Sequence, residues 1–249
     1  MYHGWGLIPG ITSFLSKRFM NYYYDIIKSD PMHVTAAHVA LYVLLAPVAG
    51  GLLSGIDRRI SARMQGRVGP PLLQPFYDVF KLMKKETLLV NRYQNFYIFM
   101  FLLFMVFTGS FMFTGADMLL MIFALTLSGI FLALAAFSVD SPFSHTGAER
   151  EIIQMMSYDP MLILVPVGIY LVTGSFRISD IMLLERPLII FLPGVFAGYI
   201  FILTMKFRKS PFDLSMSHHA HQEIVKGLTT EFSGKALAAI EVAHWYENV

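Results

Sequence analysis

The sequence predicts an all-α integral membrane protein with about five transmembrane helices and helices in its cytoplasmic loops. Of its 249 residues, 55% are hydrophobic and only 14% are charged, whereas soluble domains carry about 25% charged residues. The mean hydropathy is +0.57, and apolar runs of membrane length recur along the chain. The net charge of +2 is too small to indicate nucleic acid binding. Because there is no cysteine, disulfides, Cys-ligated Fe–S clusters and thiolate catalysis are excluded within this chain.

The chain divides into an amphipathic segment of residues 1–30, predicted to lie in the membrane interface, and a membrane domain of residues 31–249. Asp30 and Pro31 are expected to begin the first span as its N-cap and first helical residue. Five apolar runs predict the spans, at residues 31–56, 96–115, 117–139, 160–176 and 187–205.

The short connections between these runs predict how the spans begin and pair. The second and third runs follow each other almost directly, so they should form a tight antiparallel pair. Asp159 and Pro160 are expected to begin the fourth span. The chain ends at "HWYENV", and the family resemblance described below implies further spans after this point, which we expect this chain to lack.

The distribution of Lys and Arg predicts the orientation in the membrane. Residues 57–95, 140–159 and those after Met205 carry fourteen of them, and the opposite side carries five. The positive-inside rule places the fourteen on the cytoplasmic side of a multi-pass protein in the cytoplasmic (inner) membrane.

The segment between the first two spans is unusually basic and rich in Pro and Gly. Arg59, Arg63 and Arg67 recur every four residues, which predicts a basic stripe on a helix that Gly69-Pro70-Pro71 ends. A second helix should then carry one apolar face (Phe76, Val79, Phe80 and Met83) and lie in the interface. One interpretation is a positive-inside membrane anchor. The interleaved acids and amides favour a second, the docking of a protein partner.

The same segment carries a specific resemblance. "DRRISARMQGRVGPPLLQPFYDVFKLMKKE" resembles the first cytoplasmic loop of the H subunit of respiratory complex I (NADH-quinone oxidoreductase) and of its relatives in membrane-bound NiFe hydrogenases. "GAEREIIQMMSYDP" and "SPFDLSMSHHAHQEIVKGLTTEFSG" resemble two further motifs of this family, and the resemblance covers residues 34–249. The docking residues expected from it are Arg58, Arg59, Arg63, Gln65, Arg67, Gln74, Asp78, Lys81 and Arg150.

Departures from the family pattern favour one branch. The short "RVGPPLLQP" lacks an insertion found in complex I and is similar to the energy-converting hydrogenase (Ech) form, in which the corresponding protein is the B subunit. Three histidines also replace carboxylates of the family pattern after "PFDL". The resemblance implies a membrane anchor and coupling subunit that links ferredoxin-dependent electron transfer to proton or sodium transport. It holds no cofactor itself, and its partners are soluble-side subunits with the NiFe centre and Fe–S clusters and an antiporter-like membrane subunit.

Two alternatives remain open. One is the same role in a quinone-reducing complex, with the basic loop contributing to a quinone pocket. The other is a stand-alone ion transporter, which the long partner-like loops disfavour.

Ionisable residues near the cytoplasmic ends of the later spans are the candidates for proton transfer, because such groups are costly near a membrane. A carboxylate in an apolar site can change protonation near neutral pH, and histidine does so without perturbation. Glu223 and Glu231 are eight apart, so on a helix they would share a face. The histidine run invites a metal site too, but its spacing alone is weak evidence, and some acids are equally compatible with solvated loops. The candidates are Glu223, Glu231, Asp213, Asp159, Asp140, Glu151, His218, His219 and His221.

Overall fold

The computed structural model describes residues 31–88, 91–182, 184, 187–208, 212–216 and 226–249. The chain forms two compact units, residues 1–41 and 42–249. In the first unit, the described residues 31–41 are the beginning of a long helix. The expected interfacial segment of residues 1–30 lies outside the described residues.

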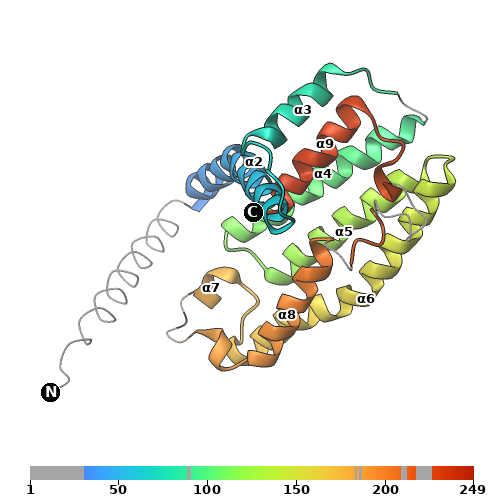
Figure 1. The fold of residues 1–249 in the computed structure, drawn as a ribbon. Coiled ribbons are helices and arrows are strands. Elements are labelled where there is room, and N and C mark those ends of the chain that lie inside the picture. Colours follow the sequence, from blue (N-terminus) through green and yellow to red (C-terminus); the bar gives the residue numbers. More distant parts are fainter. Residues whose placement is uncertain (1–30, 89–90, 183, 185–186, 209–211, 217–225) are drawn as a thin grey trace. The chain divides into compact units, whose positions relative to one another are not determined.

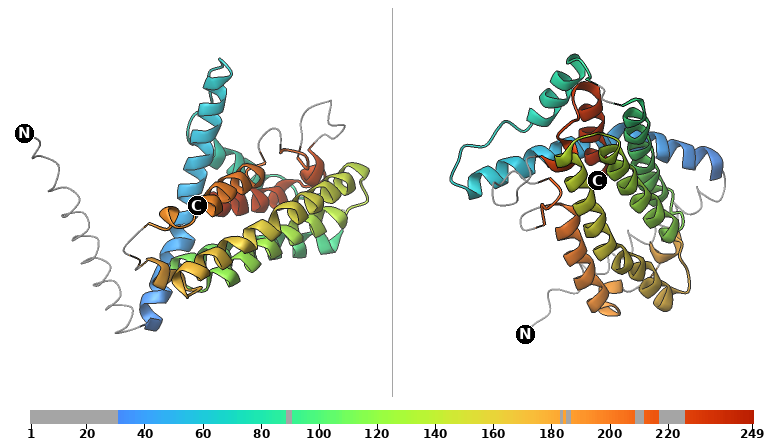
Figure 2. Two further views of the ribbon diagram at one scale, coloured as in Figure 1. Left: turned by 90° about the horizontal axis from the view of Figure 1, so that it is seen from below. Right: turned by 90° about the vertical axis from the view of Figure 1, so that its right-hand side faces the viewer.

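The described part of the chain is helical, without a named strand; Asp117 and Arg177 form an isolated bridge. The helices, shown in Figures 1 and 2, are α2 (Pro31–Met64), α3 (Gln74–Lys84), α4 (Arg92–Phe113), α5 (Met118–Phe137), α6 (Pro142–Thr173), α7 (Ile178–Met182), η1 (Leu188–Ile190), α8 (Pro193–Lys206), η3 (Gly227–Thr229) and α9 (Gly234–Glu247). Among these, α2 from Ala36, α4, α5 and α6 are long and apolar enough to cross a membrane, and α8 is a shorter apolar helix. The all-α membrane fold is confirmed.

The helices α4 and α5 form the expected antiparallel pair, joined by residues 114–117. Each begins at a side-chain cap: Asn91 Oδ1 accepts a hydrogen bond from the Tyr93 amide at 3.2 Å, and Asp117 Oδ1 accepts one from the Leu119 amide at 2.8 Å. Such caps satisfy amides that have no partner within the helix, so they fix where each helix begins.

The prediction for the fourth span is wrong about its beginning. The helix α6 begins at Pro142, and Asp159 and Pro160 lie within it, as does Pro166. Proline suits the first turn of a helix, and Pro142 takes that role. Helices in membranes also tolerate an internal proline when neighbouring groups satisfy the freed carbonyl. The residues expected to form a loop at 140–159 therefore belong mostly to this helix.

The fifth span also begins later than predicted. Residues 188–190 form the short 3₁₀ helix η1, and α8 begins only at Pro193 and covers 14 residues. Leu192, with φ −130° and ψ 53°, lies outside the helical region. The proline that follows excludes it from the helix by steric clash with its backbone.

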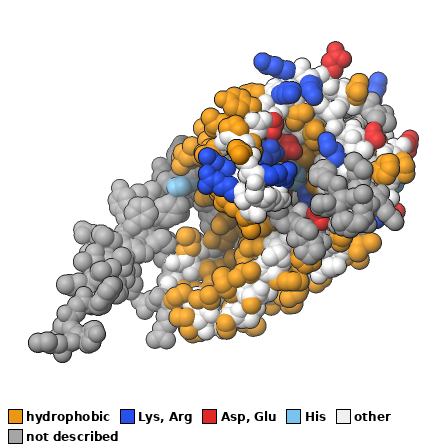
Figure 3. All heavy atoms as spheres, in the orientation of Figure 1, with side chains coloured by type: hydrophobic (Ala, Val, Ile, Leu, Met, Phe, Trp, Pro, Cys, Tyr) orange, Lys and Arg blue, Asp and Glu red, His pale blue; other side chains and the backbone are white. Residues whose placement is uncertain are grey.

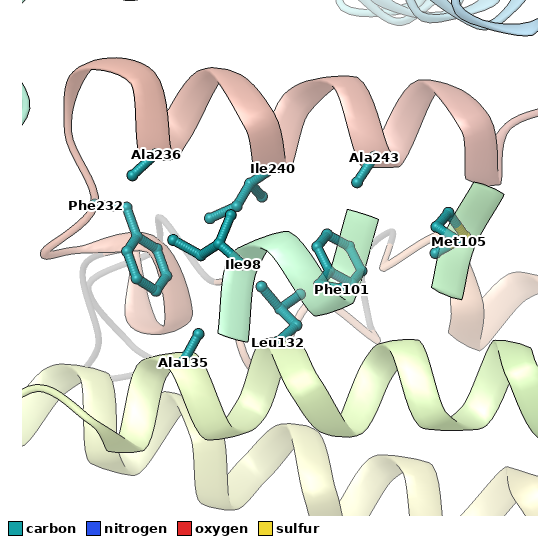
Figure 4. Packing of buried hydrophobic residues seen from close by; sticks show 9 residues of the cluster. All are labelled: Ile98, Phe101, Met105, Leu132, Ala135, Phe232, Ala236, Ile240 and Ala243. Atoms are coloured by element: carbon teal, nitrogen blue, oxygen red, sulfur yellow. The ribbon is translucent and has the colours of Figure 1, made fainter. Parts of the chain in front are cut away.

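The core of the second unit forms where α9 packs against α4 and α5. Figure 4 shows Ile240 and Ala243 of α9 meeting Ile98 and Phe101 of α4, with Leu132 of α5 on the other side. These side chains are almost completely buried. A C-terminal helix that the hydropathy pattern did not predict is therefore an interior element.

The glycines of α2 allow close helix contacts, as their spacing predicts. A Cβ at Gly50 would lie 1.9 Å from the carbonyl oxygen of Trp245 in α9, and one at Gly55 would lie 2.1 Å from that of Leu72. Neither position has room for a side chain. These glycines are therefore packing residues.

The basic stripe is shorter than predicted because α2 ends at Met64. Gly66 has φ +68°, its amide donates to the Arg63 carbonyl at 3.0 Å, and the Arg67 amide donates to the Ala62 carbonyl at 2.9 Å. This pair of hydrogen bonds around a left-handed residue is a Schellman C-cap. Arg59 and Arg63 lie on the helix, but Arg67 lies beyond it, and Gly69-Pro70-Pro71 do not end the helix.

The helix α3 forms as predicted, but its apolar residues do not form a single exposed face. Phe76 and Val79 pack against Trp245 of α9, with the Phe76 and Trp245 ring centroids 4.9 Å apart. Phe80 and Met83 are exposed. The face was expected to lie in the membrane interface, but part of it contacts the protein.

Candidate functional site

A buried ion pair joins α6 to the segment after α8. Arg208 Nη2 donates to Glu151 Oε1 at 2.6 Å, and Ser215 Oγ donates to Glu151 Oε2 at 2.5 Å. The Glu151 side chain is 3% exposed and that of Arg208 is 15% exposed. Both oxygens of the buried carboxylate are thus matched by donors, which a buried charge requires.

The backbone of Arg208 is bent to make this pair. Its φ of 48° is in the left-handed region, which is costly for a residue with a Cβ unless its surroundings hold it there. Burial alone would lower the pKa of the Arg208 guanidinium, but the negative charges of Glu151 and Glu247 raise it above its ordinary value. Arg208 is therefore a permanent positive charge in the interior.

A second charged group joins the end of α8 to the end of α9. Lys206 Nζ contacts Glu247 Oε1 at 3.1 Å, and His244 Nδ1 contacts Glu247 Oε2 at 3.1 Å. The Lys206 and Glu247 side chains are 17% and 18% exposed. Burial raises the pKa of the Glu247 carboxyl, but the charge of Lys206 and the hydrogen bond from His244 outweigh it and hold this pKa well below its usual range. Glu247 is therefore ionised.

Both groups face one small cavity. It has a volume of about 10 Å³, and Glu151, Asp159, Lys206, Arg208 and Glu247 line it, with Tyr158 among the other lining residues. Such a volume is on the order of the space that one water molecule needs. Asp159 Oδ1 is buried and has no hydrogen-bond partner among the described residues. The cavity therefore brings together two cations, three carboxyl groups and an unsatisfied carboxyl oxygen.

Gln154 holds the chain in place next to this cavity. Its amide nitrogen donates to the carbonyls of Met205 and Phe212, each at 3.1 Å. These carbonyls lie on either side of Arg208, so the α6 side chain fixes the path of the segment that carries the arginine. The side chain is buried, so loss of these hydrogen bonds would leave its amide without water to replace them.

The structure brings together only part of the predicted proton-transfer set. Glu151 and Asp159 line the same cavity. Asp140 is exposed before α6, and Asp213 lies in the partly buried segment after α8, where it interacts with other groups. Glu231 lies in a turn after η3, so it does not lie on a helix face. The remaining candidates, Glu223, His218, His219 and His221, lie outside the described residues.

Sequence reasoning missed Lys206, Arg208 and Glu247 as members of the site. The first two follow directly after an apolar run and were counted as surface charges. Glu247 lies three residues after His244, the spacing of neighbours on one helix face. This spacing could have indicated that Glu247 interacts with His244. Among the described residues, no group of three or more His, Asp or Glu side chains is arranged to hold a metal ion.

The predicted docking residues lie at the end of α2 and on α3. Arg58 Nη1 and Gln74 Nε2 each donate to Asp78 at 2.8 Å, so this ion pair ties the two helices together. At about 40% exposure it contributes little stability. Arg67 donates to Gln65. Arg59, Arg63, Arg67 and Lys81 are exposed, and Arg150 of α6 interacts within the protein.

An open groove of about 450 Å³ lies beside these residues. Asp57, Arg58, Gln65, Arg67 and Pro70 are among its lining residues. In Figure 3 charged side chains gather over the upper part of the unit, whereas hydrophobic ones cover the region over α5, α6 and α8.

Comparison with known proteins agrees with this architecture. The family described as NADH dehydrogenase matches residues 36–249. Hydrogenase-4 component C of Escherichia coli (strain K12) is 31% identical over 84% of this chain and 68% of its own length. The H subunit of NADH-quinone oxidoreductase from Geobacillus sp. (strain WCH70) is 30% identical over 78% of this chain and 63% of its own. The chain thus spans about two thirds of these relatives.

A solved structure shows the same fold. The membrane-bound sulfane sulfur reductase (MBS), an archaeal respiratory membrane complex, contains a chain that matches with a TM-score of 0.76 at 23% identity, over 85% of this chain and 74% of that one. At this identity the likeness concerns the fold. Together with the family match, the helices of membrane length identify this chain as a multi-pass membrane protein of the NADH dehydrogenase family, the family of H-type membrane subunits.

Proposed function

We propose that this chain is the membrane anchor and coupling subunit of an energy-converting complex of the hydrogenase type. In this role it links ferredoxin-dependent electron transfer in soluble-side subunits to proton or sodium transport through an antiporter-like membrane subunit. The NiFe centre and Fe–S clusters belong to the soluble-side partners. The chain itself contributes docking surfaces and groups that hold or move protons.

The buried charged cavity between α6, α8 and α9 is the observation that carries this proposal. Ionisable groups inside a bundle of membrane-spanning helices are expensive, and their presence is a sign of function. Glu151, Lys206 and Glu247 are each held by an oppositely charged partner. Asp159 lies near the middle of α6 and has one oxygen without a partner among the described residues, so it is the carboxyl group best placed to take up a proton.

The exposed arginines at the end of α2 support the docking half of the proposal. Arg59, Arg63 and Arg67 are exposed on a segment that the Arg58–Asp78 ion pair joins to α3. A basic surface next to an open groove fits the carboxylates of a partner protein. The partners remain part of the proposal, as do Asp213, Glu223 and Glu231 as further members of the proton line.

The relatives support two kinds of complex, and experiment must choose between them. Similarity to hydrogenase-4 component C and the short "RVGPPLLQP" segment favour the hydrogenase type. The similarity to the H subunit of NADH-quinone oxidoreductase and the groove lined by Arg58 and Arg67 favour a second candidate, a quinone-reducing complex.

Purification of the chain with an affinity tag from its native membranes separates these functions. We expect NiFe and Fe–S subunits to copurify, and inverted vesicles supplied with reduced ferredoxin to produce hydrogen and build an ion gradient. Copurification with a quinone-reactive dehydrogenase would support the second candidate instead. Isolation of the chain alone with ion transport activity would contradict both.

An Asp159→Asn variant tests the coupling half directly. It preserves size and hydrogen bonding but cannot take up a proton. We expect normal assembly and about a tenfold loss of ferredoxin-driven ion transport, equivalent to about 1.4 kcal/mol of barrier. Hydrogen production from an artificial donor, which bypasses coupling, should remain. Full ion transport by the assembled variant would contradict the role of Asp159.

A further inference from the structure

Lys206 lines the charged cavity together with the carboxyl groups of Glu247 and Asp159. Lys206 Nζ contacts Glu247 at 3.1 Å, and Lys206 and Asp159 both line the cavity. Glu247 is also held by His244 through its second oxygen. Asp159 Oδ1, in contrast, has no hydrogen-bond partner among the described residues. Glu247 therefore has a second donor besides the lysine, whereas one oxygen of Asp159 has no donor among the described residues.

We propose that Lys206 is the proton-exchanging partner of Asp159, and that Glu247 and His244 position the lysine for this exchange. The inference rests on the proposed coupling function and extends it to a residue outside the carboxylate line. In the step, an N–H bond of the Lys206 ammonium breaks and an O–H bond forms on Asp159, with one water in the cavity taking one proton and giving another. The products are a neutral amine and a carboxylic acid, so total charge is unchanged.

The size of the cavity fits this step. A volume of about 10 Å³ is on the order of the space that one water molecule needs, so a single bridging molecule suffices. Around it, α6 contributes Glu151 and Tyr158 besides Asp159, and Arg208 follows α8. The lining residues from α4 and α5, such as Phe101, Leu125 and Ser128, carry no charge.

The charges around the cavity favour reversible exchange. Arg208 is paired with Glu151, whose second oxygen accepts a hydrogen bond from Ser215, so Arg208 compensates one carboxylate without competing for Asp159. Glu247 remains with His244 when Lys206 gives up its proton. The loss of the ammonium charge is matched by neutralisation of Asp159, so the total charge of the cavity is unchanged. The negative charge of Glu247 then favours return of the proton to Lys206.

Lys206→Arg is the variant that separates proton exchange from a structural ion pair. Arginine preserves the positive charge and can reach Glu247, but its guanidinium does not release a proton in proteins. In inverted vesicles containing the whole complex, we expect normal subunit composition and about a tenfold loss of ferredoxin-driven ion transport. Lys235→Arg on the exposed side of α9 is the matched control and should behave as the wild type.

The Lys206→Arg result also distinguishes this inference from the proposed function. If Lys206→Arg transports ions normally while Asp159→Asn does not, the coupling function stands and the lysine step is overturned. If both variants transport ions normally, the role of Asp159 and the lysine step are both overturned. Loss of transport in both supports both.

Infrared difference spectroscopy gives a second measurement that does not depend on assembly of the Lys206→Arg variant. During ferredoxin-driven turnover of the wild-type complex, we expect the C=O band of a protonated carboxylic acid to appear and to be absent in Asp159→Asn. Where Lys206→Arg assembles, that band should also be lost. If the wild-type complex shows no such band, the proposal is overturned.

Discussion

Arg208 and Glu151 are 57 residues apart, yet the guanidinium of one donates to the carboxylate of the other at 2.6 Å. The arginine adopts φ 48° directly after α8, and the glutamate lies on a buried face of α6. A left-handed backbone at a residue with a Cβ is stable only where the surroundings compensate for it. Here the ion pair and the hydrogen bond from Ser215 to Glu151 provide that compensation.

Replacement of Glu151 by Gln should strongly destabilise the protein. The change leaves the Arg208 charge buried without its partner, and breaking a buried ion pair in this way costs about 3–5 kcal/mol. We expect a lower thermal unfolding midpoint of the detergent-solubilised complex and less protein in the membrane. Glu149→Gln, two residues earlier and exposed, is the control and should change stability by no more than about 0.5 kcal/mol.

The double variant Glu151→Gln/Arg208→Met tests the origin of that loss. Removing both charges leaves no buried arginine without a partner. The double variant should therefore be less destabilised than the sum of the two single variants predicts. Additive effects would show that the ion pair does not stabilise the contact between α6 and the segment after α8.

Glu247 should make stability depend on pH in the acidic range. Its folded-state pKa lies well below the usual value because Lys206 and His244 outweigh burial. A carboxyl group with a lowered pKa stabilises the fold above its unfolded pKa, about 4.3 for Glu, and this contribution is lost as pH falls towards the folded pKa. The difference in unfolding midpoint between the wild type and Glu247→Gln should therefore be largest near neutral pH and shrink on acidification. A constant difference would contradict the assignment.

Gly50→Ala should disrupt the contact between α2 and α9. The added methyl carbon would lie 1.9 Å from the Trp245 carbonyl oxygen, so the helices must separate, at a cost of about 1–3 kcal/mol. The control is Gly194→Ala in α8, where nothing lies within 4 Å of the added carbon. Unfolding midpoints of both variants check this, and equal midpoints would contradict a close α2–α9 contact.

The exposed arginines at the end of α2 should be needed for docking. Replacement of Arg63 and Arg67 by Ala removes two exposed charges, and neither side chain takes part in the Arg58–Asp78 ion pair. We expect the chain to insert normally and the soluble-side subunits to be released from membranes at moderate salt. Arg177→Ala, exposed on the opposite side, should leave them bound. Retention of an active complex in the double variant would favour the membrane-anchor interpretation.

Labelling of a single introduced cysteine should confirm the orientation. Lys84 is exposed at the end of α3, and the chain has no cysteine of its own. A membrane-impermeant thiol reagent should label Lys84→Cys in inverted vesicles and not in intact cells, because the positive-inside rule places this loop in the cytoplasm. Two of the fourteen basic residues that support this orientation, Lys206 and Arg208, form internal ion pairs. Labelling in intact cells would refute the orientation.

The fold class, the family and the positions of α3, α4 and α5 could be predicted from the sequence. Hydropathy gave the α4–α5 pair because each helix is continuous in sequence and bounded by local capping residues, Asn91 and Asp117. Their place near the cytoplasmic ends of the later spans made Glu151 and Asp159 candidates for proton transfer.

The first residues of α6 and α8 and the partners in the buried ion pairs could not be predicted from the sequence, because they depend on tertiary packing. Pro160 was expected to begin a helix, since the local rule takes no account of neighbouring helices that stabilise an internal proline. Arg208 with Glu151 and Lys206 with Glu247 are joined across 57 and 41 residues, so no local pattern relates them. In the sequence, a charged residue next to an apolar run looks the same as one at the water-exposed end of a membrane span. Packing of α6, α8 and α9 is what removes it from water and makes it part of a site.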